Sequence, residues 1–299
     1  MRKPAAHFHL PGLFEFYKFY HAFLPLYRAH RAYFYDWCEI ASIYGAPEGC
    51  IWGGGRVGSG TAGAQEVLAL MQDFGISARL TFSNCLLRPE HLIDHPCNAL
   101  CRAFSDSAGP QNGVIVHSEL LLTYLKKHYP RLYFVSSTTK VLTRSQLRQE
   151  LERDDFSYVV PDFRLNRSFA QLQALPQTLK DKTEFLCNEG CWSGCMERRA
   201  CYEAVSRKNL GAPGPEHRCT AQEAANGYRF SRAMEGPGFI GVQDIQTTYL
   251  PMGFSQFKIE GRGLGNALLL EFLLHYLTKP EYHLHVREAL YLDNTLDLF

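Results

Sequence analysis

The sequence predicts an α/β fold in which eight short strands and their connecting helices form a (β/α)8, TIM-barrel-like domain. Two observations predict it. The chain has 299 residues, which is long enough for one such barrel, since these typically need about 250 residues. Short runs rich in Val, Ile, Phe and Tyr alternate with amphipathic runs of helical period, a pattern typical of a parallel sheet covered by helices. A doubly wound open sheet is the alternative.

The predicted strands are short and apolar, as expected of strands that are buried on both faces. Their number favours the barrel over the open sheet. They are Glu39–Tyr44, Ala78–Phe82, Gly113–Val116, Leu132–Val135, Ser157–Val160, Thr183–Cys187, Phe239–Val242 and Phe254–Ile259.

The predicted helices lie between these strands and carry apolar stripes of helical period. Thr143 is a candidate N-cap. The helices are Ala64–Phe74, Ser118–His128, Thr143–Arg153, Ser168–Leu175 and Gly265–Leu277.

The stretch Lys208–Pro237 fits no strand–helix unit, because Gly and Pro interrupt it repeatedly. A loop of this length inside a compact fold usually has a function. We therefore expect a single domain over residues 1–299, with a cysteine-containing loop and an insertion or lid over residues 188–237.

Charge and hydropathy exclude several classes of protein. Lys and Arg number 31 and Asp and Glu number 30, so bulk polycationic binding of nucleic acid is not indicated, although a local basic patch is left open. No run reaches the roughly 18 apolar residues of a membrane span, and the N-terminus lacks a secretory signal. We expect a cytoplasmic protein, in which the ten cysteines do not form a disulfide scaffold.

Five cysteines cluster between positions 187 and 219. Thiolates packed closely in a reducing compartment are stable together mainly when a metal neutralises them. Their uneven spacing favours an iron–sulfur cluster over a zinc site, although zinc and ordinary buried thiols remain alternatives. Cys187 lies in a predicted strand and can equally belong to the core. We expect structural roles for the remaining five, which are Cys38, Cys50, Cys85, Cys97 and Cys101.

Polar side chains follow several predicted strands, where barrel enzymes carry their chemistry. The run from Pro161 to Arg167 contains Asp162, Arg164 and Asn166, and its guanidinium groups suit a carboxylate or phosphate. The alternative is an Asp–Arg ion pair that closes the barrel rim. His117 and Glu189 also follow predicted strands.

The segment Phe257–Arg262 alternates apolar or small residues with Lys258, Glu260 and Arg262. Period two places these three on one side of an extended segment. If they face the barrel interior, they must pair with one another or serve a ligand, because isolated buried charge is costly.

A glycine-rich loop, from Trp52 to Arg56, precedes a predicted helix. It is either a flexible loop or a cradle in which backbone N–H groups and Arg56 hold an anion. His7 and His9 are interpreted as surface or packing residues.

The ending GFSQFKIEGRGLG resembles the FKIEGR signature of the peptidase U32-like family, and FIGVQDIQTTYL resembles the segment before that signature. The resemblance covers roughly residues 113–274 and implies a TIM-barrel-like domain. In several family members a [4Fe-4S] cluster is held by four cysteines, which here would be Cys191, Cys195, Cys201 and Cys219. The cysteine spacing and the N-terminal third depart from the family pattern, so the substrate is not carried over.

The resemblance implies an enzyme of oxygen-independent hydroxylation, or of a related modification, on a small or tethered anionic or aromatic substrate. A non-catalytic zinc-stabilised module that binds a protein or RNA is the first alternative, and a peptidase is the second. A protein partner or a homo-oligomer is left open. The candidate catalytic residues are Glu260, Arg262, Asp162 and His117, and the candidate substrate-binding residues are Arg164, Asn166, Lys258, Glu189 and Arg56.

Overall fold

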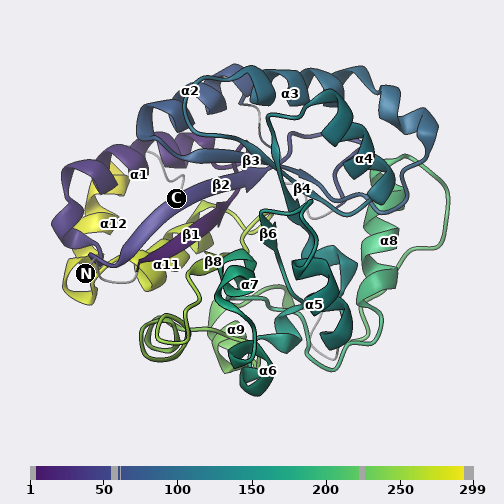
Figure 1. Cartoon of the computed structure of the whole chain (residues 1–299). Coiled ribbons are helices and arrows are strands. Elements are labelled where there is room, and N and C mark those ends of the chain that lie inside the picture. The colour runs from purple at the N-terminus through teal and green to yellow at the C-terminus, as the bar shows by residue number, and fades with distance from the viewer. Residues whose placement is uncertain (1–4, 55–59, 61, 222–225, 293–299) are drawn as a thin grey trace.

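The computed structural model describes residues 5–54, 60, 62–221 and 226–292, and it confirms the barrel. Eight parallel strands form one sheet in the order β6-β5-β4-β3-β2-β1-β8-β7 (Figure 1). A parallel bridge between Val159 and Thr183 joins the two ends of this order. The strands are β1 Ala6–Pro11, β2 Cys38–Gly45, β3 Ser77–Phe82, β4 Gly113–Val116, β5 Tyr133–Ser136, β6 Tyr158–Val159, β7 Glu184–Leu186 and β8 Gln256–Lys258.

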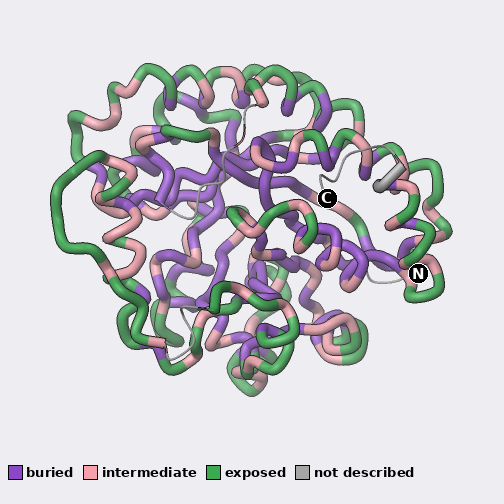
Figure 2. Tube along the Cα trace, turned by 180° about the vertical axis from the view of Figure 1, so that it is seen from behind, coloured by how far each residue is buried: buried purple, intermediate pink, exposed green. Residues whose placement is uncertain are grey.

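Helices surround the strands, and the predicted helices are confirmed as α2, α4, α5, α6 and α11. Figure 2 shows the buried chain concentrated at the centre and the exposed chain on the outer helices. The helices are α1 Tyr17–Ala29, α2 Ala64–Phe74, α3 His95–Asp106, α4 Glu119–His128, α5 Arg144–Leu151, α6 Phe169–Gln173, α7 Gln177–Lys182, α8 Arg198–Asn209, α9 Phe230–Glu235, α10 Val242–Asp244, α11 Asn266–Leu277 and α12 His283–Leu292.

One predicted strand is wrong and one strand was missed. Phe239 and Ile240 are buried, but they make only one backbone hydrogen bond to the end of β7, from Ile240 N to Cys187 O (3.0 Å), and helix α10 begins at Val242. The eighth strand is β1, whose Phe8 packs in the main hydrophobic core.

The barrel interior holds a polar cluster from five strands, β1, β2, β3, β7 and β8. His9, interpreted from the sequence as a surface or packing residue, is fully buried here. Ser42 lies 2.7 Å from its Nδ1, and its Nε2 lies 3.0 Å from Gln256 Oε1. Burial, together with the charge of Arg79, lowers the pKa of His9 to about 3, so the ring is neutral at pH 7.

The charged part of this cluster is built on Glu184. Arg79 donates to Glu184 (2.5 Å), and Lys258 donates to its other oxygen (3.3 Å). Burial opposes ionisation of Glu184, but Arg79 and its other cationic neighbours outweigh this effect and hold its pKa well below the usual range. The carboxylate therefore stays charged inside the barrel, where both of its oxygens are paired.

Helix α8, from the segment predicted as a loop and insertion, is fastened to the loops that follow β2, β3 and β5. Asn209 donates to Gly53 O (2.7 Å), Asn84 donates to Ser206 O (3.1 Å), and Arg199 donates to Val141 O (3.3 Å). Among the described helices none is long and apolar enough to cross a membrane.

Candidate functional site

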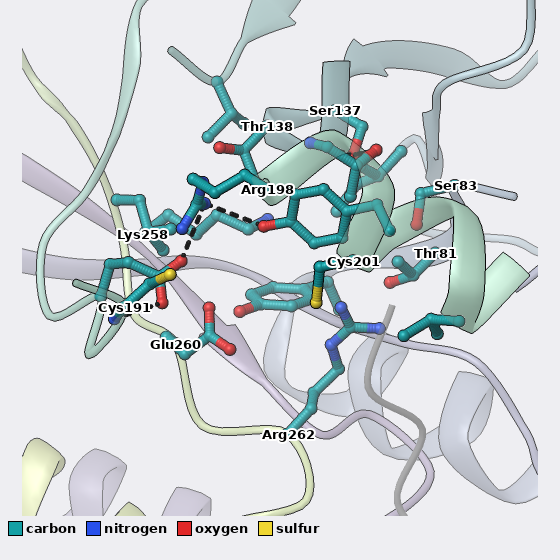
Figure 3. Close-up of a pocket in the computed structure, with 18 of the residues that line it drawn as sticks. Thr81, Ser83, Ser137, Thr138, Cys191, Arg198, Cys201, Lys258, Glu260 and Arg262 are labelled. Atoms are coloured by element: carbon teal, nitrogen blue, oxygen red, sulfur yellow. Dashed lines mark hydrogen bonds and ion pairs between the residues drawn. The ribbon is translucent and has the colours of Figure 1, made fainter. Parts of the chain in front are cut away.

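A pocket of about 120 Å³ lies at the carboxyl ends of the strands and is covered by α8 (Figure 3). This is the end of a barrel at which catalytic residues collect. Of the predicted catalytic and substrate-binding residues, Lys258, Glu260, Arg262 and Glu189 line it. The pocket lining also includes Tyr44, Thr81, Ser83, Ile115, Ser137, Thr138, Val160, Leu186, Cys191, Cys195, Arg198, Cys201, Tyr202, Val205 and Cys219.

Lys258 forms part of the pocket wall from β8 and is 5% exposed. Its ammonium group lies 3.6 Å from the centroid of the Tyr44 ring and donates to Glu184. Burial, with Arg79 and Arg262 nearby, lowers its pKa to about 8. Lys258 pairs with Glu184, which is one of the two outcomes expected from the sequence. It also lines the pocket, and its role toward a ligand stays a prediction.

Arg262 is the second cation at the same aromatic ring. Its guanidinium carbon lies 5.5 Å from the Tyr44 ring centroid. Glu260 points into the same space (Figure 3). Lys258, Glu260 and Arg262 all line the pocket, as the period-two pattern of this extended segment predicts, although β8 itself ends at Lys258.

Two hydroxyl groups at the end of β3 complete this part of the pocket. Thr81 is 3% exposed and Ser83 is 1% exposed, and both line the cavity. Among the described residues neither oxygen has a hydrogen-bond partner. Such groups are uncommon in folded proteins and call for an explanation.

Glu189 lies in an ion-pair network beside the pocket. Arg198 from α8 donates to Glu189 (3.2 Å), and its Nε lies 3.2 Å from a carboxylate oxygen of Asp162. The backbone N–H of Cys191 donates to the other oxygen of Glu189 (3.1 Å). Glu189 therefore anchors both α8 and the cysteine loop.

Asp162, Arg164 and Asn166 do not line the pocket. Asp162 accepts from Arg164 Nε (2.6 Å), which confirms the alternative of an Asp–Arg pair at the barrel rim. The buried amide of Asn166 donates to Leu186 O (2.8 Å) and Gly238 O (2.7 Å). These three residues position the surrounding loops.

His117 also lies outside the pocket lining but reaches it through a chain of hydrogen bonds. Its Nδ1 lies 2.8 Å from Thr139 Oγ1, and Thr139 donates to Ser137 Oγ (2.9 Å), which lines the pocket. Burial lowers the pKa of His117 to about 4, so the ring is neutral at pH 7. Because Thr139 gives its hydroxyl proton to Ser137, the tautomer that matches this arrangement donates from Nδ1 to Thr139. Ser137 Oγ accepts in this series of hydrogen bonds, so its own hydroxyl proton is available for donation to a ligand. Arg56 lies outside the described residues.

The four cysteines predicted as metal ligands all line this pocket. Cys195 is buried, Cys191 and Cys201 are half-buried, and Cys219 is exposed. Burial raises the pKa of the Cys191 thiol to about 11. The donor set suits a metal site, but among the described residues no three His, Cys, Asp or Glu side chains are gathered closely enough to hold a metal.

Sequence reasoning missed Tyr44, Thr81 and Arg198. Tyr44 and Thr81 belong to predicted strands. Every second side chain of a barrel strand faces the interior, and those near the carboxyl end of the strand reach the site, so this alternation could have identified both residues. Arg198 had no such signal, because the position of α8 depends on contacts with loops that are distant in sequence.

The barrel is similar to one of known structure. The chain aligns with the solved U32 peptidase Mk0906 with a TM-score of 0.51 and 13% sequence identity, over 87% of this chain and 93% of that chain. This likeness shows a shared fold, as the FKIEGR resemblance implies. No protein-family model matches the sequence, and no curated protein matches it.

Proposed function

We propose that this chain is a barrel enzyme of the U32-like type that binds a small or tethered anionic substrate in the pocket at the carboxyl ends of its strands. One observation carries the proposal: Lys258 and Arg262 lie at the same Tyr44 ring in the pocket lining. Perturbed ionisable groups in a cleft of this kind are typical of functional sites.

The charges at this end of the barrel support an anionic ligand. Glu184 is the buried partner of Arg79 and Lys258, so the pocket floor carries one more cation than anion. Arg262 and Glu260 balance each other in formal charge. A singly charged anion would therefore neutralise the pocket and reduce the cost of the buried lysine charge. The other charged pair in the lining, Glu189 and Arg198, adds no net charge.

Two further groups have positions suited to chemistry on a bound substrate. Glu260 points into the cavity opposite Thr81 and Ser83 (Figure 3), where its carboxylate would take or return a proton. Ser137, oriented by Thr139 and His117, would donate a hydrogen bond to a substrate oxygen.

We also propose that Cys191, Cys195, Cys201 and Cys219 bind a [4Fe-4S] cluster, with zinc as the alternative. Support comes from the thiol chemistry and from their position on one pocket. Binding would require these thiols to come closer together than they lie in the structure. A bound cluster would supply electron transfer. Oxygen-independent hydroxylation is the reaction that the family resemblance suggests, in a reducing compartment that suits ten free thiols.

The anion-binding proposal is tested by ligand capture. Wild-type protein and the Arg262→Gln variant are incubated with a small-molecule extract, washed and analysed by mass spectrometry. We expect wild-type protein to retain anionic compounds that the variant loses. Arg287→Gln, which removes a surface ion pair with Glu271, serves as the matched control and should retain them. Equal retention by all three proteins would refute the proposal.

The cluster proposal is tested separately by iron and sulfide analysis after anaerobic reconstitution. We expect about four irons per chain in wild-type protein and loss of iron in the Cys191→Ser/Cys195→Ser variant. The Cys38→Ser variant, which changes a thiol outside the pocket, should retain iron. Zinc alone would favour the zinc-stabilised binding module.

A further inference from the structure

Thr81 and Ser83 line the pocket with hydroxyl groups that have no hydrogen-bond partner among the residues that the structure describes. Both are more than nine-tenths buried, and both line the cavity. By contrast, Ser137 and Thr138 in the same lining are hydrogen-bonded to Thr139 and Pro161. A buried hydroxyl without a partner is costly, and replacing it with an apolar group would remove that cost. Its presence in a pocket indicates a polar ligand group at this point.

The surroundings of the two hydroxyls define the charge of that group. Thr81 and Ser83 lie on one side of the pocket, and the guanidinium group of Arg262 reaches toward Thr81 (Figure 3). Glu260 and Cys191 lie on the other side (Figure 3). The two hydroxyls therefore lie beside the positive charge of Arg262. A group that accepts hydrogen bonds from both hydroxyls at this point would be stabilised by a negative charge.

We propose that Thr81, Ser83 and Arg262 together form a subsite for a carboxylate group of the substrate, an inference that rests on the anion-binding function proposed above. A carboxylate has two oxygens in one plane, which match the guanidinium fork and leave acceptor positions for both hydroxyls. Its single negative charge equals the excess positive charge of the pocket. A phosphate monoester carries about −1.5 to −2 and would overcompensate it.

The remainder of the pocket defines the body of the acid. Ile115, Val160 and Leu186 contribute apolar surface, and Tyr44 and Tyr202 contribute rings. The volume of about 120 Å³ is on the order of that of a cavity that takes up benzene. The substrate class is therefore a small carboxylic acid with an apolar body, whose far end lies near Glu260 and Cys191.

The test uses calorimetric titration with benzoate, its neutral isostere benzamide, and phenyl phosphate. We expect wild-type protein to bind benzoate more tightly than either of the other two. Thr81→Val and Ser83→Ala should each weaken benzoate binding about ten- to 150-fold, the effect of one lost hydrogen bond to a charged group, and weaken binding of the uncharged benzamide less. Thr123→Val, which removes a hydroxyl on the exposed face of α4, should bind benzoate like wild-type protein.

A thermal melt of the same variants gives a second measurement. Because neither hydroxyl has a partner in the part of the chain that the structure describes, Thr81→Val and Ser83→Ala should melt at the wild-type temperature or above it. Benzoate binding that is lost in Arg262→Gln but unchanged in both hydroxyl variants would overturn the subsite and leave the anion-binding function standing. Absence of any anion binding to wild-type protein would overturn both.

Discussion

At the centre of the barrel, Arg79, Glu184 and Lys258 form a buried charge cluster in which every oxygen of Glu184 is paired. Replacing one member of such a cluster leaves the others uncompensated, which is more costly than losing the pair as a whole. This cluster also sets the charge of the pocket floor, so the same residues determine both stability and anion binding.

Glu184→Gln should therefore lower the free energy of unfolding by about 3–5 kcal/mol, measured by urea denaturation. Its control is Glu152→Gln, which breaks an exposed helical ion pair with Arg148 (2.9 Å) and should change stability by less than about 0.5 kcal/mol. Equal effects of the two substitutions would show that burial does not determine how much these ion pairs contribute to the free energy of unfolding.

The buried His9 should make the free energy of unfolding depend on pH in the acid range. Its pKa is about 3 in the folded chain and about 6.5 when unfolded, so between these values the unfolded chain binds an additional proton. Stability should fall as the pH is lowered from about 6.5 toward 3, by up to about 1.4 kcal/mol per pH unit from this residue. His9→Gln should make the pH dependence shallower, while His21→Gln, on an exposed position of α1, should not. Parallel profiles for His9→Gln and wild-type protein would contradict this assignment.

At the scale of elements, β7 and β8 continue to interact beyond their last paired residues through a side chain. The buried Asn188 donates to Glu260 O (3.0 Å), and its Oδ1 accepts from Glu260 N (2.7 Å). These two hydrogen bonds replace the backbone hydrogen bonds that a neighbouring strand would make to Glu260, where Glu260 and Arg262 enter the pocket. Asn188 therefore positions both residues.

Asn188→Ala leaves the backbone N–H and C=O of Glu260 without these partners. We expect a loss of about 2–4 kcal/mol in the free energy of unfolding, together with weaker benzoate binding. Asn209→Ala removes a single hydrogen bond, to Gly53 O, and should cost about 1 kcal/mol. A smaller cost for Asn188→Ala than for Asn209→Ala would contradict the ladder role.

Most elements were predictable because their local patterns agree with their environment. The alternation around Lys258 predicted an inward-facing row, and apolar periodicity predicted α2 to the residue. The strand β1 was missed because its His9 reads as polar while the barrel buries it in a hydrogen-bonded cluster. Phe239 and Ile240 were misassigned because burial alone, without a strand ladder, produces the same apolar signal.

The site was predictable only where it follows strand ends. Lys258, Glu260, Arg262 and Glu189 were found in this way, and the thiols were found by their clustering. Asp162 and Asn166 also follow a strand, and the local pair of Asp162 with Arg164 was expected. Their other partners, Arg198 on α8 and Gly238, are distant in sequence. Local sequence does not encode such partners.

At the scale of the whole molecule, the barrel has one weak seam. Seven strand pairs form ladders, whereas β6 and β7 meet through a single bridge between Val159 and Thr183. The strand β6 has only two residues. Opening of the barrel should therefore begin at this seam, away from the extensive β1–β2 ladder.

Amide hydrogen exchange measured by NMR tests this expectation. Backbone amides of β6 and β7 should exchange faster than those of β2 and β3, because opening the seam breaks the fewest hydrogen bonds. Equal exchange rates for the backbone amides of all strands would contradict this expectation. They would show that loops and helices stabilise the contact between β6 and β7 as strongly as ladders stabilise the other strand pairs.

The pocket beside Tyr44 is proposed to hold a carboxylate through Arg262, Thr81 and Ser83. A crystal structure of the protein soaked with benzoate would show this contact. We expect the carboxylate within hydrogen-bond distance of the Arg262 guanidinium group and both hydroxyls, with the ring directed toward Glu260. Benzoate bound only elsewhere, or in this pocket with its carboxylate turned away from all three residues, would contradict it.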